Sequence, residues 1–473
     1  MLVDTREVGK VIAKVPNAQL KYLLLRYCYV AKINYYQRTV PPKLVCSFVS
    51  SFEKSVKELC GSLFDCGWTE DTMPEDVWEQ CCFNITEGGL GLRQHGDVSQ
   101  CAFVASLVES LPTIERYSPK FSRQLDTSRE QSLVVRQFRK ALRFINRRSG
   151  ESFSVTNLDE VKSLLASKRH DETLQGILMA GMSSVRLHAF KTSLEADPHR
   201  LAFFISINDG NAGRWLDVCP KSERFSFSDD EFKTLLCYRF FMKQPSFIPG
   251  SKCNCKSRPE LDPLGHHLAT ACAKGGFRNG THTALEYVVK DLLNCAGIMA
   301  RREETGCFRG ADENNNNRPD LSIWNMPQRE GKVVADIQVT CPVPVKFRRA
   351  LSVNQAKKPG RAAELAHRAK VNKYAAIAAA NNLEFQSLIF ESTGRIHSSC
   401  AGFLKAAITK MSQGNEKLNS VFTNFWMSRV VCTLQKGISS AILCRSNLIN
   451  GNLVRETNYE FSYSFMVEHD IVV

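Results

Sequence analysis

A short apolar segment of this chain carries an acidic residue where a core side chain is expected. Residues 333–339 read VVADIQV, a pattern that predicts a buried β-strand, and Asp336 lies at its centre. A carboxylate in such a strand is costly unless it is paired with a cation or bound to a metal ion. The fold must therefore bring a partner to Asp336.

A second acidic residue is expected directly opposite Asp336. Strand-like residues run from Leu321 to Trp324 and from Lys332 to Thr340, and the residues between them are turn-like. In a hairpin centred on Gln328, Asp320 and Asp336 are cross-strand neighbours, whose Cβ atoms lie about 4.5–5.5 Å apart. At that distance the two carboxylates can bind one divalent cation.

Two further groups are expected beside this acidic pair. Gln338 follows Asp336 by two residues, so its side chain points to the same face of the strand. Downstream, the Ala-rich segment 361–382 predicts a helix whose least polar stripe includes Lys373, with Lys370 at the border of that stripe. We expect Lys373, or else Lys370, to orient a water molecule or to hold a phosphate.

The residues between the predicted hairpin and this helix are strongly basic. From Pro342 to Lys373 there are nine Lys or Arg residues and one Glu. The whole chain has a formal net charge of +14, which favours an anionic partner such as nucleic acid or a membrane surface. No uninterrupted apolar run approaches the length of about 18 residues that a membrane span needs. Contacts with a phosphate backbone are expected from Lys346, Arg348, Arg349, Lys357, Lys358 and Arg361.

Cysteine and histidine residues are concentrated upstream of the hairpin, in the text CNCKSRPELDPLGHHLATAC. Zinc takes four thiolate or imidazole ligands in a tetrahedron, so Cys253 and Cys255 at one end and His267 and Cys272 at the other suit it. His266 could replace His267. A bound ion would stabilise a segment with little apolar content. The alternative is a set of unrelated free thiols beside a surface His-His pair.

The other cysteines indicate a reducing compartment. The chain has 18 cysteines scattered over 473 residues, unlike the dense frameworks of small secreted domains. Its first residues, MLVDTREVGKVIAKV, carry charges throughout and lack the apolar stretch of a secretory signal. We therefore expect the protein in the nucleus or the cytoplasm.

The first 250 residues have helical periodicity. One apolar stripe with three- and four-residue steps is formed by Leu20, Leu23, Leu24, Tyr27 and Ala31. After the Pro41-Pro42 break, a second stripe is formed by Phe48, Phe52, Val56 and Leu59. The glycines of NITEGGLGLR predict a tight turn between helices, because no strand precedes them as a phosphate-binding loop would require.

The order of these features resembles the C-terminal part of the polyproteins of non-LTR retrotransposons that carry a restriction-like endonuclease. In those proteins a Cys-Cys-His-Cys knuckle precedes a nuclease of the PD-(D/E)XK class. The matching residues of the knuckle are Cys253, Cys255, His267 and Cys272. The nuclease motifs are matched by Arg318-Pro319-Asp320, by Asp336, and by Lys370, Lys373 and Tyr374. The segment that joins the knuckle to the nuclease in that family is similar to the one that carries Gly275, Gly276, Arg278, His282 and Glu303 here. The region that follows the polymerase in that family is similar to LLRYCYVAKINYYQRTVPP and EGGLGLR.

This resemblance implies a fold and a division of the chain. The expected fold is an α/β nuclease core, a restriction-endonuclease-like mixed sheet with flanking helices, preceded by a mainly α-helical region. Within the core we expect a helix over about 283–295 and a last strand over 387–390. The implied segments are a post-polymerase, thumb-like region at 1–130, a helical linker domain at 131–250, the zinc knuckle at 251–275, the endonuclease at 276–410 and a C-terminal extension at 411–473.

Three features differ from the family pattern. Gln338 stands where many of these enzymes have a lysine two residues after the second acid, so a helix lysine has to replace it. The loop between Cys255 and His267 is longer than the usual knuckle spacing. The chain has no Tyr-x-Asp-Asp polymerase motif, so we expect a truncated copy or a 3′-terminal piece that does not polymerise.

The implied function is Mg²⁺-dependent hydrolysis of DNA for target-site nicking. Asp320 and Asp336 would hold Mg²⁺, with Gln338 or a backbone oxygen beside them and Glu303 as an accessory ligand. The helix lysine would orient the attacking water, and Zn²⁺ would be structural. DNA is the expected partner, and RNA of the same element is a second candidate. The alternatives are a catalytically inactive nucleic-acid-binding remnant and a zinc-stabilised helical protein with no nucleic-acid role.

Overall fold

The fold is taken from a computed structural model, which describes residues 2–64, 66–126, 132–150, 153–308, 318–343 and 350–450. The chain packs as two compact units. The N-terminal unit holds the chain up to Pro16 together with Leu20–Asn84 and Gly89–Ala196. The C-terminal unit holds Asn17–Gln19, Ile85–Gly88 and the chain from Asp197 onward. The finer five-segment division of the sequence stays a prediction.

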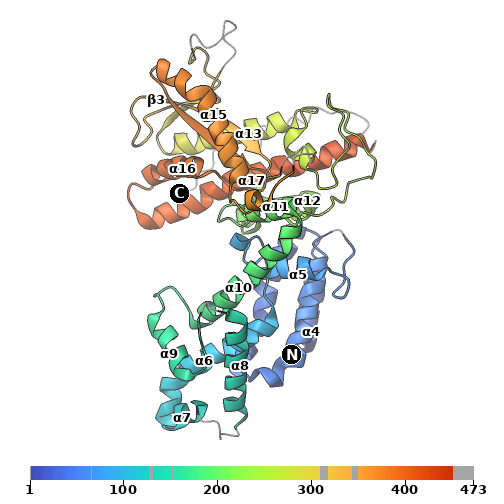
Figure 1. Ribbon diagram of the computed structural model, residues 1–473, viewed down its shortest axis with the longest axis vertical. Helices are drawn as coiled ribbons and strands as arrows, with labels where there is room; N and C mark the ends of the chain where they lie inside the picture. Colours follow the sequence, from blue (N-terminus) through green and yellow to red (C-terminus); the bar gives the residue numbers. More distant parts are fainter. Residues whose placement is uncertain are drawn as a thin grey trace. The chain divides into compact units, whose positions relative to one another are not determined.

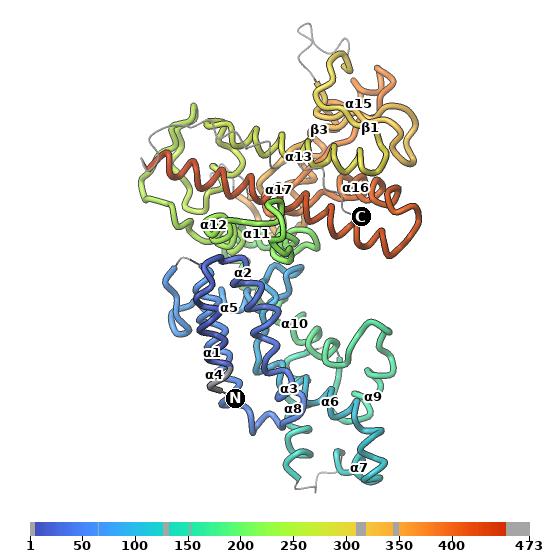
Figure 2. The backbone as a smooth tube through the Cα atoms, turned by 180° about the vertical axis from the view of Figure 1, so that it is seen from behind, coloured from blue at the N-terminus to red at the C-terminus, as the bar shows by residue number. Residues whose placement is uncertain are grey.

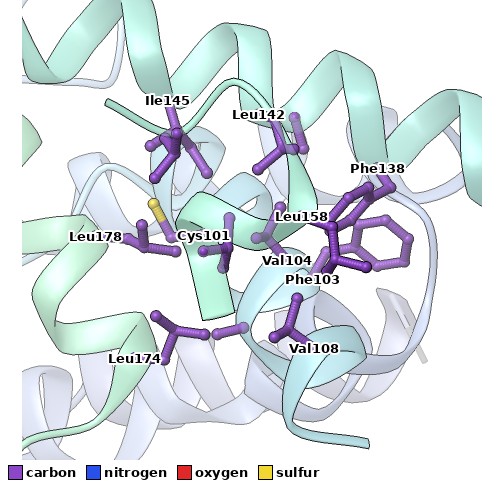
Figure 3. Close-up of a cluster of buried hydrophobic side chains, with 14 of the residues drawn as sticks. Cys101, Phe103, Val104, Val108, Phe138, Leu142, Ile145, Leu158, Leu174 and Leu178 are labelled. Carbon is purple, nitrogen blue, oxygen red and sulfur yellow. The ribbon is translucent and has the colours of Figure 1, made fainter. Parts of the chain in front are cut away.

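The N-terminal unit consists of helices around an apolar core, as the periodicity of the first 200 residues predicts. Side chains of α6, α8, α9 and α10 meet in that core, and Figure 3 shows Phe138, Leu142 and Ile145 pointing into it. The predicted stripe of α4 is confirmed, because its four members are buried. The helices are α1 (Leu2–Ala13), α3 (Asn34–Thr39), α4 (Pro42–Gly61), α5 (Glu75–Cys82), α6 (His95–Tyr117), α7 (Phe121–Asp126), α8 (Leu133–Ser149), α9 (Leu158–Ser167) and α10 (Leu174–Ser193).

The predicted stripe near residue 20 is wrong. In α2 (Ala18–Leu23) and the helical turns that follow it, Leu20 and Tyr27 are exposed, whereas the buried side chains are Tyr22, Leu25, Tyr29 and Ile33. Leu20 is already exposed within α2, and the buried side chains recur at steps of three and four residues, so the predicted stripe lies on a different face of the same helical pattern. The leucines therefore predicted the helix but not its buried side. The turns that continue α2 are Leu24–Tyr29 and Val30–Ile33.

His95 at the start of α6 predicts an acid-sensitive N-terminal unit. Its ring is 1% exposed and packs edge-on against Phe52, and burial, with a smaller effect of Arg93, lowers the pKa of His95 to about 3. Between pH 6.5 and 3 the unfolded chain binds a proton that the folded unit does not, so stability is complete above pH 6.5 and falls by about 1.4 kcal/mol per pH unit on acidification. Glu53 and Asp97, whose pKa values burial raises, contribute with the opposite sign.

The His95 contribution is isolated by comparing the protein with its His95→Gln variant. The free energy of unfolding of wild type, relative to that of the variant, should fall by about 2 kcal/mol between pH 7 and pH 5. Hydrogen exchange of the α6 amides measures it at both pH values. An advantage that stays constant would contradict a neutral, buried imidazole.

The C-terminal unit combines helices with one four-stranded mixed sheet, so the coarse α/β prediction is confirmed. Its strands lie in the order β1-β2-β3-β4, with β1, β2 and β3 antiparallel and β4 parallel to β3. The strands are β1 (Met299–Arg302), β2 (Leu321–Trp324), β3 (Lys332–Thr340) and β4 (Glu384–Glu391). The helices are α11 (Pro198–Ile207), α12 (Asp229–Arg239), α13 (Phe277–Cys295), α14 (Val353–Ala356), α15 (Arg361–Ala380), α16 (Ser398–Met411) and α17 (Glu416–Ile449).

The pairing of β2 with β3 has the predicted register. Leu321 lies opposite Ala335 and Trp324 opposite Lys332, which centres the hairpin on Gln328. The predicted last strand is confirmed as β4, and the predicted helix over 283–295 as α13, which begins earlier, at Phe277. Both faces of β3 are covered, which explains its nearly continuous apolar sequence.

Helix α15 forms the crossover between the parallel strands β3 and β4 and packs against both. Ala363 and Ala366 contact Ile389 of β4, and Tyr374 and Ala378 pack with Val334 of β3. The face of β3 that carries Val334 also carries Asp336 and Gln338, because strand side chains alternate. These residues therefore point toward α15.

Helix α17 runs beside α13 in both views of the backbone (Figures 1 and 2). The two helices approach closely at Gly437, where a Cβ atom would lie 2.3 Å from Oγ1 of Thr281. The adjacent residue on α13 is His282. The sequence after about residue 410 has a helix-like and then a strand-like pattern; α17 confirms the helix, and the strand-like residues 459–466 lie outside the described residues. Among the described residues, no helix combines the length and the apolar character needed to cross a membrane.

Candidate functional site

The predicted acidic pair lies where the hairpin enters the sheet. Continuing the register of β2 and β3 by one residue puts Asp320 opposite Asp336, on the face toward α15. Asp336 is 7% exposed, and the Asp320 side chain is 17% exposed. Burial, and then the charge of Asp320, raises the pKa of Asp336. The two carboxylates are therefore close enough to repel each other.

Asp320 is held by the backbone of β3 and by α13. Its Oδ2 accepts a hydrogen bond from the Ile337 backbone N–H at 2.5 Å and lies 3.1 Å from Nε2 of His282. The other ring nitrogen of His282, Nδ1, lies 2.7 Å from Oε1 of Glu286. Glu286 in turn accepts a hydrogen bond from Nε of Arg302 at 2.7 Å. A connected chain of charges thus links β1, α13 and the start of β2.

The surroundings of His282 favour the charged form of its ring. Burial disfavours its charge, but hydrogen bonds to Asp320 and Glu286 outweigh that cost and raise the pKa of His282 to about 10. His282 and Glu286 are four residues apart on α13, so one helix face presents both. The resemblance included His282 without a specific role, and Glu286 was missed. The spacing of a His and a Glu by four residues in a predicted helix was the signal that could have found them.

The lysine that reaches the acidic pair is Lys370, not Lys373. Nζ of Lys370 forms an ion pair with Oδ2 of Asp336. Lys373 is exposed and donates a hydrogen bond to the hydroxyl of Tyr374 at 2.8 Å. The buried face of α15 contains Ala366 and Tyr374, and half-buried Lys370 lies between them, whereas Lys373 is exposed. The predicted order of the two lysines is therefore corrected.

Of the two remaining predicted residues, only one belongs to this face. Gln338 is half-buried and follows Asp336 on the α15 side of β3. Glu303 is exposed and has a left-handed backbone with φ of 47°. Its backbone N–H donates to the carbonyl of Asp320 at 3.1 Å. Glu303 therefore contacts Asp320 through its backbone, and the accessory role of its carboxylate stays a prediction.

The predicted basic residues are only partly described. Lys357 and Lys358 are exposed after the short helix α14, and Arg361 is half-buried at the start of α15. The other three, Lys346, Arg348 and Arg349, lie outside the described residues. Contact of these six residues with a phosphate backbone therefore stays a prediction.

The predicted cysteine and histidine ligands form one buried cluster. The ligand atoms of Cys253, Cys255, His267 and Cys272 all lie within 4.8 Å of one another. Sγ of Cys253 is 3.6 Å from Sγ of Cys272, and Sγ of Cys255 is 3.6 Å from Nε2 of His267. Burial disfavours the thiolate of Cys255, but hydrogen bonds, chiefly from Ser257, outweigh that cost and lower the pKa of Cys255 to about 6. The cluster could hold a metal ion, and its donors are compatible with structural zinc.

Neighbouring groups fix the ligand geometry. The carboxylate of Asp262 accepts hydrogen bonds from the backbone N–H groups of His266 and His267, both at 2.8 Å. The ring of His266 packs against Phe203 and Tyr238, away from the four-ligand cluster, which settles the choice between the two histidines. Sequence reasoning missed the role of Asp262, although an acid just before a helical turn is a frequent cap.

The end of α17 also reaches the cluster. The guanidinium of Arg445 is buried, lies 3.9 Å from Sγ of Cys253 and donates a hydrogen bond to Oδ1 of Asn254. A positive charge at that position favours the thiolate form of a neighbouring cysteine. This contact joins residues 191 positions apart, so no local pattern could have predicted it.

The donor set at the sheet suits a hard divalent cation. His282, Glu286 and Asp320 have ligand atoms within 4.8 Å of one another, so this group could itself hold a metal ion. The carboxylates of Asp320 and Asp336 form a neighbouring donor pair of the kind that Mg²⁺ and similar ions prefer. Such an ion would relieve the repulsion that raises the pKa of Asp336.

Comparison with known proteins adds no relative. No model of a protein family matches the chain, and no curated protein matches it. Function is therefore inferred from the geometry of the two sites.

Proposed function

We propose that the C-terminal unit is a Mg²⁺-dependent DNA endonuclease of the PD-(D/E)XK type, similar to the restriction-like endonuclease of non-LTR retrotransposons. The observation that carries the proposal is the meeting of Asp320, Asp336 and Lys370 on one face of a mixed sheet. Two carboxylates and an amine from three separate elements form the minimal set for hydrolysis of a phosphodiester at a divalent cation. The Cys/His cluster supports the proposal as the structural zinc site that precedes the nuclease core.

The residues of the site have distinct roles in this mechanism. Asp320 and Asp336 would hold Mg²⁺, which when bound lowers the pKa of a water molecule and neutralises charge on the scissile phosphate. Lys370 replaces the absent lysine at position 338, orients the attacking water and balances the developing charge. His282, with Glu286 and Arg302 behind it, fixes the rotamer of Asp320 and is a positioning residue.

The test is nicking of supercoiled plasmid DNA by the full chain. Wild type should convert the plasmid to open circles with Mg²⁺ and leave it intact without added Mg²⁺, and Asp336→Asn should abolish nicking. Glu330→Gln is the matched control, because Glu330 is an exposed acid in the turn of the same hairpin. Equal nicking by wild type and Asp336→Asn, with equal zinc content, would contradict the assignment of Asp336 to the nuclease site.

A pair of lysine variants tests the corrected role of α15. Lys370→Met should lower the nicking rate by about 10²–10³-fold, the usual cost of losing one charge-stabilising donor. Lys373→Met should change the rate by less than about threefold, since that lysine is directed at Tyr374 and not at the acidic pair. The two variants and wild type are compared by their single-turnover nicking rates on the same plasmid. The reverse order of effects would restore Lys373 as the catalytic lysine.

A specific observation favours the second candidate, an inactive nucleic-acid-binding remnant. Both carboxylates already have cationic partners from the chain, Lys370 for Asp336 and His282 for Asp320. A protein that keeps its fold after losing turnover could retain this neutralised pair. DNA binding does not separate the candidates, because they share it. Absence of nicking with Mg²⁺ or Mn²⁺, with intact zinc and DNA binding, would favour the remnant.

A further inference from the structure

Helix α8 of the N-terminal unit has one buried apolar side and one basic side. Its sequence, LVVRQFRKALRFINRRS, contains six cations and no acid. Phe138, Leu142 and Ile145 are at most 1% exposed and fill the core of the unit, as Figure 3 shows. The helix is therefore fixed in place by its apolar side, and its other side faces solvent.

Two of the six cations hold the unit together. Arg139 donates hydrogen bonds to the carbonyl oxygens of Gln124 and Leu125 at the end of α7. Arg148 forms an ion pair with the buried carboxylate of Asp97 on α6. The remaining four have no structural role of this kind among the described residues. We call them the α8 basic face: Arg136, Lys140, Arg143 and Arg147.

The α8 basic face is exposed and carries unbalanced charge. All four residues are exposed, and in the described part of the chain no carboxylate pairs with any of them. The side chains of Arg143 and Arg147 donate to carbonyl groups of their own helix. A face that is merely solvated usually mixes both signs of charge, which this one does not.

The spacing of the four cations suits a row of phosphates. They recur at steps of four, three and four residues, which places them in one line along the helix. The line is roughly 16 Å long at about 1.5 Å per residue. The part of this line from Arg136 to Arg143 borders a hollow of about 280 Å³. Lys43 of α4 also lines the hollow, as a cation in addition to the four of the α8 basic face.

The packing of α8 argues against a membrane surface as the partner. A basic helix that binds lipid inserts its apolar side among the acyl chains. Here that side is already buried against α6, α9 and α10. Only the charges remain available, and a line of charges is what contact with a nucleic-acid backbone requires.

We infer that the α8 basic face, with Lys43, is a binding site for the sugar-phosphate backbone of a nucleic acid, separate from the acidic pair of the C-terminal unit. No base-reading group is part of this face, so it binds without sequence preference and holds a strand while the other unit acts. The site does not require that the acidic pair cleave DNA. It lies in a unit for which the sequence predicted no nucleic-acid contact.

The test measures binding of fluorescently labelled RNA, single-stranded DNA and duplex DNA to the full chain by anisotropy, over a series of salt concentrations without added Mg²⁺. The variant carries Arg136→Gln, Lys140→Gln, Arg143→Gln and Arg147→Gln, which keep the helix and remove the charge. Each lost phosphate contact reduces the slope of log affinity against log salt by about 0.7–0.9. The quadruple variant should therefore lose about 2.8–3.6 from the slope on every sequence tested.

A matched control removes the same charge elsewhere in the unit. It changes four exposed cations of other elements to Gln: Arg6, Lys14, Lys32 and Lys162. This control should keep the wild-type slope. An equal loss in both quadruple variants, or a wild-type slope in the α8 variant, would overturn the site. Loss of binding to phosphatidylserine vesicles without loss on nucleic acid would also overturn it, in favour of a lipid surface.

Discussion

A Cys255→Ser variant should purify without the zinc ion that we expect the wild-type protein to carry. The cluster is closed by four ligands, and such sites contribute about 10–16 kcal/mol of apparent binding free energy that is coupled to local folding. Apart from the four ligands, the buried side chains of residues 251–275 are only Leu261, His266, Leu268 and Ala269, so the segment has a small apolar core of its own. We expect the amides of this segment to lose protection against hydrogen exchange.

The loss should extend to the end of α17. Arg445 is buried beside Cys253 and Asn254, so a disordered cluster removes two of the groups that this guanidinium contacts. The control is Cys219→Ser, which removes an exposed thiol of the same unit. It should keep one zinc ion per chain and wild-type exchange rates. A Cys255→Ser protein with full zinc content would show that these four residues are not the ligands.

Replacing Gly437 with valine should separate α13 from α17. Even the Cβ atom would lie 2.3 Å from Oγ1 and 2.8 Å from Cβ of Thr281, and Cβ is fixed to the backbone. Overpacking of this kind costs about 3 kcal/mol or more where the backbone has to move. We expect the free energy of unfolding of the C-terminal unit to fall by that amount in urea titrations. The nicking rate should fall as well, because His282 follows Thr281 on the displaced helix.

Two controls accompany the Gly437 variant. Gly402 of α16 is also a helical glycine, but it is exposed and a Cβ there meets nothing within 4 Å. Gly402→Ala should stabilise the unit by up to about 1 kcal/mol through helix propensity alone. Adding Thr281→Ala to Gly437→Val removes two of the three clashing atoms and should restore part of the stability. No rescue would indicate that the contact with Thr281 is not what limits this position.

The features that the sequence predicted are those encoded within short stretches. The hairpin register follows from a turn flanked by two apolar runs, so the amino-acid order alone is enough to pair Asp320 with Asp336. The four ligands of the cluster also lie within 20 residues of sequence. Side-chain alternation then placed Gln338 correctly on the face of Asp336.

The errors have two causes. Some helices show little difference in hydrophobicity between their faces, and some contacts join residues that are far apart in the sequence. In an Ala-rich helix many faces look equally apolar, so the sequence favours Lys373, whereas packing of Tyr374 against β3 and β4 fixes the rotation of α15. The leucines near residue 20 misled for a similar reason, because apolar residues occur on more than one face of this helix and the buried face is the one with Tyr22, Leu25 and Tyr29. Glu286 and Arg445 act through partners 16 and 192 positions away, which no pattern in one sequence reveals.

Helix α17 has 34 residues and contacts two parts of the unit. Arg445 contacts the Cys/His cluster, and Gly437 packs against α13. A ribosome completes this helix after every other described element. Until α17 has been synthesised, the nascent chain lacks its contacts with the Cys/His cluster and with α13. The apolar side of α13 is then exposed to solvent. We expect translation products that stop short of α17 to depend on chaperones and to be degraded rather than to persist as half-active fragments.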